Sequence, residues 1–176
     1  TQSLTLSNKR DQFEIMRWKE RGASSIISNP ITMDHTMMRQ FVLPSLLRLL
    51  SSNRHHELPQ RVYELGEVVH DSRNKISASW ACAEVGSGFA SAKGIAQALV
   101  RDLGGTLDEV EYRPMDTGDG PWIGGRGSRV IIDGIEVGQF GEIDPEVSNK
   151  FGLKSPIHAG EFDVERLAAA IPDPVL

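Results

Sequence analysis

The most apolar stretch of the chain follows Asn29-Pro30, and its hydrophobic positions recur at helical spacing. Met33, Met37 and Phe41 are four residues apart, which is typical of one helix face and predicts a helix that ends near Val42. Leucines continue the pattern beyond Pro44. Because proline inside a helix destabilises it by about 3 kcal/mol, we place Pro44 in the first turn of a second helix, residues 45–52.

Shorter apolar runs with strand-forming residues follow this region. They predict two strands, residues 61–69 and 77–85, joined by a polar turn at residues 71–75. Residues 89–103 carry apolar side chains on one helical face, and Gly104-Gly105 provides the stop signal of that helix. The middle of the chain therefore predicts a hairpin followed by a helix.

Asp133-Gly134 is the strongest short hairpin signal in the chain, and it joins strands predicted at residues 130–132 and 135–140. Strands outnumber helices and follow one another in hairpins, which predicts one α+β domain, residues 1–176, with a mainly antiparallel sheet. The other expected elements are strand fragments at 4–6 and 25–27, a strand at 110–113, a glycine-rich loop at 114–127, a helix opened by Asp144-Pro145 and closed by Gly152, a strand at 157–162 and a helix at 164–170.

Composition narrows the class of protein. Of the 176 residues, 39% are hydrophobic and 24% are charged, as in an ordinary globular domain. The single cysteine, Cys82, excludes an internal disulfide and suits the cytoplasm. No apolar run approaches the roughly 20 residues of a membrane span, so no membrane partner is expected. The formal net charge of −5 argues against strong binding of nucleic acid by this chain alone, and an RNA-related role would work through a partner.

Several stretches, in order and at matching distances, resemble the β subunit of phenylalanyl-tRNA synthetase of the archaeal and eukaryotic type. The resemblance spans about residues 4–170 and implies a class II aminoacyl-tRNA synthetase-like fold, an antiparallel sheet flanked by helices. It also implies that the chain is a C-terminal fragment of a longer subunit. The main stretches are Asn29-Pro30-Ile31-Thr32, Leu43-Pro44-Ser45-Leu46-Leu47, Val62-Tyr63-Glu64-Leu65-Gly66-Glu67, Gly138-Gln139-Phe140-Gly141-Glu142 and Pro156-Ile157-His158-Ala159-Gly160-Glu161-Phe162.

The resemblance also implies that the chain lacks catalytic residues. Class II synthetases bind ATP with an arginine in a strand-loop-strand motif and with a second one in a Gly-x-Gly-x-x-Arg motif. Here Arg166 matches the second motif, but Glu161 and Asp163 stand at its glycine positions, where carboxylates would repel a triphosphate. In the first motif, His70-Asp71 stands where an arginine is expected. We therefore expect no catalytic, cofactor-binding or metal-binding residue in this fragment, and we expect ATP and magnesium to serve the whole enzyme.

The same resemblance implies a partner, the α subunit, in an (αβ)2 assembly that binds tRNA as a whole enzyme. The apolar residues between Met33 and Leu50 are a candidate interface with this subunit, because methionine suits adaptable contacts. The alternative is that they form an ordinary core. The function predicted is structural support of the α subunit, which attaches phenylalanine to tRNA. A stand-alone binding or regulatory module and a free-standing amino-acid-activating enzyme are the alternatives, and the lost glycines argue against the enzyme. The candidate interface residues are Met33, Met37, Met38, Phe41, Leu46 and Leu50.

Two weaker motifs admit a functional and a structural interpretation. His55-His56 in a polar loop resembles a metal site, but adjacent side chains point apart and no third ligand has a recognisable spacing, which favours a solvated loop. Trp122 in the glycine-rich loop, close to Arg126 and Arg129, would suit stacking on RNA, but nearby acidic residues favour packing or a subunit contact.

Overall fold

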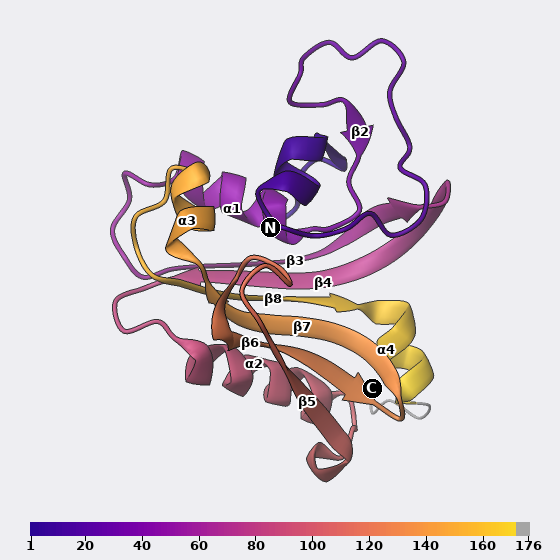
Figure 1. Cartoon of the computed structure of the whole chain (residues 1–176), viewed down its shortest axis with the longest axis vertical. Helices are drawn as coiled ribbons and strands as arrows, with labels where there is room; N and C mark the ends of the chain where they lie inside the picture. The colour runs from indigo at the N-terminus through magenta and orange to yellow at the C-terminus, as the bar shows by residue number, and fades with distance from the viewer. Residues whose placement is uncertain (172–176) are drawn as a thin grey trace.

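A six-stranded antiparallel sheet forms the centre of the molecule in the computed structural model, which describes residues 1–171 (Figure 1). The last strand of the chain, β8, lies between β4 and β7, so residues near the C-terminus reach the middle of the sheet. The order across the sheet is β3 (Gln60–His70), β4 (Arg73–Ala83), β8 (Ile157–Asp163), β7 (Ile135–Ile143), β6 (Trp122–Ile132) and β5 (Val110–Met115).

Helices and the N-terminal segment cover the two faces of this sheet. One face packs against α2 (Phe89–Asp102), which lies below the sheet in Figure 1, and against α4 (Val164–Ala170), which lies at its right end. The other face packs against α1 (Leu43–Ser52), α3 (Pro145–Lys150) and residues 1–42. Each face has its own apolar core, as the alternation of side chains along a strand requires. The predicted α+β class II-like fold is confirmed.

The N-terminal segment is mostly irregular, with short elements that pair with one another. It contains β1 (Leu6–Ser7), one π-helical turn η1 (Arg10–Glu14) and β2 (Met37–Met38), which pairs with β1. A 3-10 turn, η2 (Leu107–Glu109), leads into β5. Within the described residues, no helix is long and apolar enough to cross a membrane.

The predicted helix ending near Val42 is wrong. Backbone N–H groups in this region donate to distant segments instead, Met38 to Ser25 O at 2.9 Å and Arg39 to Thr5 O at 2.8 Å. Tertiary pairing with β1 and the bridge between Ile26 and Met37 therefore overrides the helical spacing. Helix α1 begins at Leu43, two residues earlier than expected, with Pro44 in its first turn as predicted.

The hairpin predictions differ in accuracy. Asp133 and Gly134 adopt φ values of 48° and 73° and turn β6 into β7, as predicted. The β3–β4 turn is shorter than the expected residues 71–75, because only Asp71 and Ser72, at φ 50° and 60°, separate the paired His70 and Arg73. The expected loop at 114–127 is also partly wrong, since β6 begins at Trp122.

Candidate functional site

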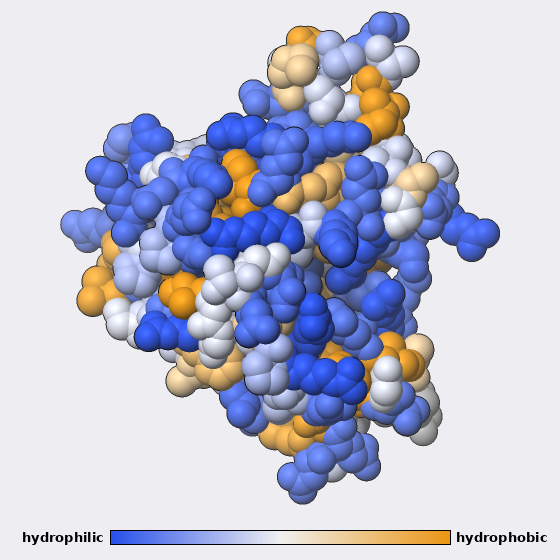
Figure 2. Space-filling model, in the orientation of Figure 1, coloured by the Kyte–Doolittle hydropathy of each residue, from blue (hydrophilic) through white to orange (hydrophobic). Residues whose placement is uncertain are grey.

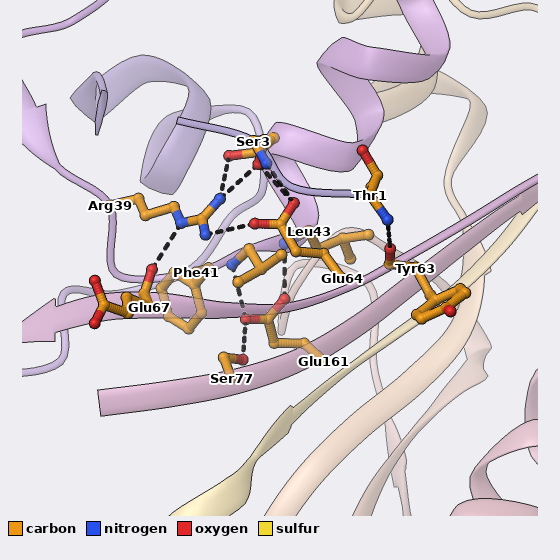
Figure 3. A network of polar contacts seen from close by, with 12 residues as sticks. Thr1, Ser3, Arg39, Phe41, Leu43, Tyr63, Glu64, Glu67, Ser77 and Glu161 are labelled. Carbon is orange, nitrogen blue, oxygen red and sulfur yellow. Dashed lines mark hydrogen bonds and ion pairs between the residues drawn. The ribbon is translucent and has the colours of Figure 1, made fainter. Parts of the chain in front are cut away.

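Glu161 occupies the centre of the site that the sequence singled out. It lies in β8 opposite Ser79 of β4, and its side chain points to the face covered by α1, whereas Phe162 packs in the core beneath the other face. Glu161 Oε1 accepts hydrogen bonds from Val42 N at 2.8 Å and Ser77 Oγ at 2.6 Å, and Oε2 accepts from Leu43 N at 2.7 Å (Figure 3). The carboxyl group therefore caps the first turn of α1, whose N–H groups lack partners within the helix.

Burial has a large effect on this carboxyl group. Desolvation raises the pKa of Glu161 above its usual value, although hydrogen bonds from Ser77, Val42 and Leu43 act to lower it. The pocket that Glu161 helps to line has a volume of about 10 Å³, which is about the space of one water molecule. A nucleoside has no room beside this side chain.

Arg21 supplies a positive charge near the same group. Its guanidinium carbon lies 5.0 Å from the centre of the Phe41 ring, and its backbone N–H donates to Gln40 Oε1 at 2.7 Å. Burial lowers the pKa of Arg21, while the nearby charges of Glu161, Glu136 and Asp163 act to raise it. Arg21 of the N-terminal segment thus packs over the Phe41 ring and helps to cover this face of the sheet. No local sequence signal indicated this role.

Asp163 and Arg166 also have structural partners. Asp163 Oδ1 accepts from the backbone N–H of Arg166 at 3.0 Å and caps α4. The Arg166 side chain lies 3.6 Å from Asp163 Oδ2 and donates to the Glu136 carbonyl oxygen at 3.1 Å. A cavity of about 340 Å³ remains beside these residues, with Arg21, Lys75 and Asp71 in its walls. The arginine that matches the ATP motif is therefore tied to β7 and to its own helix cap.

His70 and Asp71, the residues that match the strand-loop-strand motif, also have structural partners. His70 Nε2 lies 2.9 Å from Gln40 O, and burial lowers the pKa of His70. Asp71 Oδ1 accepts from Ala23 N at 2.6 Å, so the tight turn is fastened to the N-terminal segment. Arg73 is exposed at the first position of β4.

Further across the same face, indole rings fill the space over β6 and β7. Gln139 Oε1 accepts from Trp18 Nε1 at 3.0 Å and from Trp122 Nε1 at 2.8 Å. Trp122 is 1% exposed, and Trp18 packs on Phe41 with ring centres 4.3 Å apart. The packing interpretation of Trp122 is therefore the correct one, and stacking of this ring on RNA is excluded in this fold.

A second buried network lies between the N-terminal segment and the edge strand β3. Arg39 Nη2 is 2.7 Å from Glu64 Oε1, both side chains are 1% exposed, and Arg39 also donates to Ser3 Oγ at 2.7 Å and Glu67 O at 2.9 Å (Figure 3). Burial acts to raise the pKa of Glu64, but hydrogen bonds from Ser3 and Arg39 outweigh it, and the net pKa is lowered. Thr1 N donates to Tyr63 O at 2.9 Å, so this network covers an otherwise free sheet edge.

The structure corrects the candidate interface. Met37, Phe41, Leu46 and Leu50 are buried in the core of this chain, because the expected helix does not form and α1 turns its leucines toward the sheet. Met38 is half-buried and Met33 is 80% exposed, so the interface prediction stays a prediction for these two alone. His55 and His56 lie in an exposed loop, and residues 1–171 contain no group of three or more His, Cys, Asp or Glu side chains that could hold a metal ion.

Comparisons with known proteins agree with the fold and the order of the motifs. Residues 1–164 match a family model described as the phenylalanyl tRNA synthetase beta chain CLM domain. A phenylalanine–tRNA ligase beta subunit from Methanopyrus kandleri is 39% identical over 175 residues, covering 96% of this chain and 29% of the relative. The beta subunit from Pyrococcus furiosus is 36% identical over 172 residues, covering 94% of this chain and 30% of the relative.

The chain thus spans less than a third of the length of the curated relatives it matches. Among solved structures, a pyrrolysyl tRNA synthetase from Desulfitobacterium hafniense superposes with a TM-score of 0.74 at 13% identity, over 95% of this chain and 60% of that one. This likeness establishes a shared fold.

Proposed function

The chain belongs to the phenylalanyl-tRNA synthetase β-chain CLM domain family, and from that membership we propose that it is a synthetase-like domain without catalytic activity of its own. Its function is to support the α subunit structurally, and the α subunit performs the ATP-dependent attachment of phenylalanine to tRNA.

One observation carries the proposal of inactivity. Glu161, at the first glycine position of the ATP motif, has its carboxyl group bound to Val42 N and Leu43 N at the start of α1. Asp163, at the second glycine position, is occupied as the cap of α4. Glycine at such positions lets the backbone approach a nucleotide. Here the carboxyl side chains of Glu161 and Asp163 fill that space, and a carboxylate repels a phosphate group. These contacts support a site that has become part of the protein core.

ATP and magnesium, in this proposal, bind to the α subunit of an (αβ)2 assembly, and tRNA binds to the assembly as a whole. The net charge of −5 supports this division of work, because phosphate neutralisation by basic side chains supplies much of the affinity for RNA.

The arm at residues 24–36 offers a surface for the α subunit. It projects from the top of the molecule in Figure 1, and Figure 2 shows apolar residues on it. Ile31 is 100% exposed, Met33 is 80% exposed and Ile26 is 58% exposed. Large apolar side chains gathered on a projecting segment are typical of a surface that a partner covers. We place the α-subunit contact on this arm instead of the buried leucines of α1.

The experiment is phenylalanine-dependent exchange of pyrophosphate into ATP. The isolated chain is expected to give the rate of a blank without enzyme, and the αβ complex serves as the active control. Exchange by the isolated chain that disappears in the Arg166→Ala variant would disprove the proposal. Capture of the co-expressed α subunit by the wild-type chain tests the supporting role separately.

A further inference from the structure

A pocket at the other end of β4 from the turn at Asp71 has no part in the site described above. It has a volume of about 510 Å³ and lies between the loop after α1 and the loop after α3, which run side by side at the left end of the sheet in Figure 1. Its walls include Leu50, Ala83 and Leu153, all of which are buried core residues, and Leu58, which is 42% exposed. The volume is within the range of pockets that bury a small ligand, and the apolar lining suits a ligand with a large apolar side chain.

The ionisable side chains that line this pocket are basic. Arg54, Lys154, His55 and His56 line it, and none of its lining residues within 1–171 is an aspartate or a glutamate. In the described part of the chain, neither Arg54 nor Lys154 forms an ion pair, so no carboxylate of this region neutralises either charge. In a chain with a net charge of −5, a pocket that brings together two unpaired cations is electrostatically complementary to an anion.

Helix ends explain part of this arrangement. Arg54 directly follows the C-cap residue of α1, where positive charge interacts favourably with the helix dipole, whereas Lys154 lies four residues beyond the last residue of α3. The dipole explains neither the hollow apolar lining nor the lack of carboxylates among the lining residues. Both are features of a binding site.

The loop that carries the histidines is ordered before any ligand binds. Gln60 Nε2 donates to Asn53 O at 3.0 Å and to His56 O at 2.9 Å, and His56 N donates to Asn53 O at 2.9 Å. A pre-ordered loop loses less conformational entropy on binding.

We propose that this pocket docks an acidic peptide segment of a partner protein, one that carries a large apolar side chain beside its carboxylates. The apolar side chain enters between Leu50, Leu58 and Leu153, and the carboxylates meet Arg54 and Lys154. A peptide fits better than RNA, because the described residues that line the pocket include no Phe, Tyr or Trp to stack on a base. The net charge also opposes a polyanion more than a short acidic segment. This proposal is independent of the missing catalytic activity.

The test titrates the ¹⁵N-labelled chain with the probe acetyl-Glu-Glu-Leu-Glu-Glu-amide and follows amide chemical shifts. Saturable shifts are expected at Leu58, Gly152 and Ser155. The Arg54→Glu and Lys154→Glu double variant is expected to weaken binding at least about tenfold. Arg10→Glu with Arg73→Glu is the matched control, because it changes the net charge equally at exposed arginines outside the pocket, and it is expected to change affinity less than about twofold.

Two further probes and one variant separate the contributions. Replacing the leucine of the probe by serine is expected to weaken binding. The Leu58→Ser variant, at the mouth of the pocket, is expected to weaken binding of the original probe. A probe with lysines in place of its glutamates is expected to leave the spectrum unchanged. Equal weakening by the control variant, shifts located elsewhere, or no saturable binding would overturn the proposal. Tighter binding of a uridine hexanucleotide than of the acidic probe at the same residues would also overturn it, in favour of RNA. A well-dispersed spectrum of each variant establishes that it is folded.

Discussion

Replacing Glu161 by glutamine tests whether its carboxyl group now serves the core. The substitution preserves the volume of the side chain but exchanges one acceptor oxygen for an amide group that only donates. In the wild-type chain, the two oxygens accept from Val42 N at 2.8 Å and from Leu43 N at 2.7 Å. A glutamine has one oxygen for these two N–H groups, so one of them loses its acceptor.

A buried donor without a partner destabilises a fold by about 1–3 kcal/mol. We therefore expect the free energy of unfolding of the Glu161→Gln variant to fall by about 1–3 kcal/mol at pH 4. Glu165→Gln is the matched control, because the side chain of Glu165 in α4 is 55% exposed and pairs with Lys75 at 3.1 Å. An exposed pair of this kind predicts a change within about 0.5 kcal/mol.

The effect of pH follows from the direction of the pKa shift. Burial raises the folded-state pKa of Glu161 above the unfolded value of 4.5, so the protonated group stabilises the folded chain below pH 4.5. That contribution is lost as pH rises through the folded-state pKa. Ser77 Oγ lies 2.6 Å from Glu161 Oε1 and 3.0 Å from Phe162 O, so a protonated Glu161 can donate to Ser77 while Ser77 donates onward. The difference between wild type and Glu161→Gln is therefore expected to shrink from pH 4 to pH 8.

Urea unfolding at a series of pH values, followed by tryptophan fluorescence and by circular dichroism, measures both quantities. Equal stability of Glu161→Gln and wild type at pH 4 would show that the carboxyl group does not hold the start of α1. A difference that grows with pH would show that the ionised form is the favoured one, and the direction argued for the pKa would be wrong.

Three other substitutions have defined outcomes. Arg39→Ala leaves Glu64 buried without its ion-pair partner and is expected to destabilise the fold by about 3–5 kcal/mol in urea unfolding. The pKa of Glu64 is lowered in the folded chain, so ionised Glu64 stabilises the fold above pH 4.5 and this contribution is lost on acidification. The difference from wild type should therefore narrow in acid, and a difference that does not change with pH would contradict the pair. Met37→Asp places a charge in the core and is expected to unfold the chain, measured as loss of the near-ultraviolet circular dichroism signal. Met33→Asp changes an exposed residue, so this variant is expected to fold but no longer to capture the co-expressed α subunit. Unimpaired capture would show that the arm is not the interface. Gln139→Leu leaves two buried indole N–H groups unpaired and is expected to lower the unfolding free energy by about 2–5 kcal/mol, with a loss below 1 kcal/mol as the contrary result.

Features that depend on neighbouring residues could be predicted from the sequence alone. The Asp133-Gly134 turn, the cap and proline that open α3, and the apolar face of α2 are local signals, and the structure has each of them. The order of motifs was sufficient to identify the family and its fold. Glu161 and Asp163, at the positions where the family resemblance implies glycines, were also visible, because a motif is read residue by residue.

The contacts that these residues make depend on the three-dimensional fold. Met33, Met37 and Phe41 have helical spacing, yet the backbone between them pairs with distant segments, as in the bonds from Met38 to Ser25 O and from Arg39 to Thr5 O. Glu161 meets the start of α1 from 118 residues away. Such contacts form because β8 enters the centre of the sheet beneath α1, and no local periodicity encodes which distant N–H group a buried carboxyl group will meet.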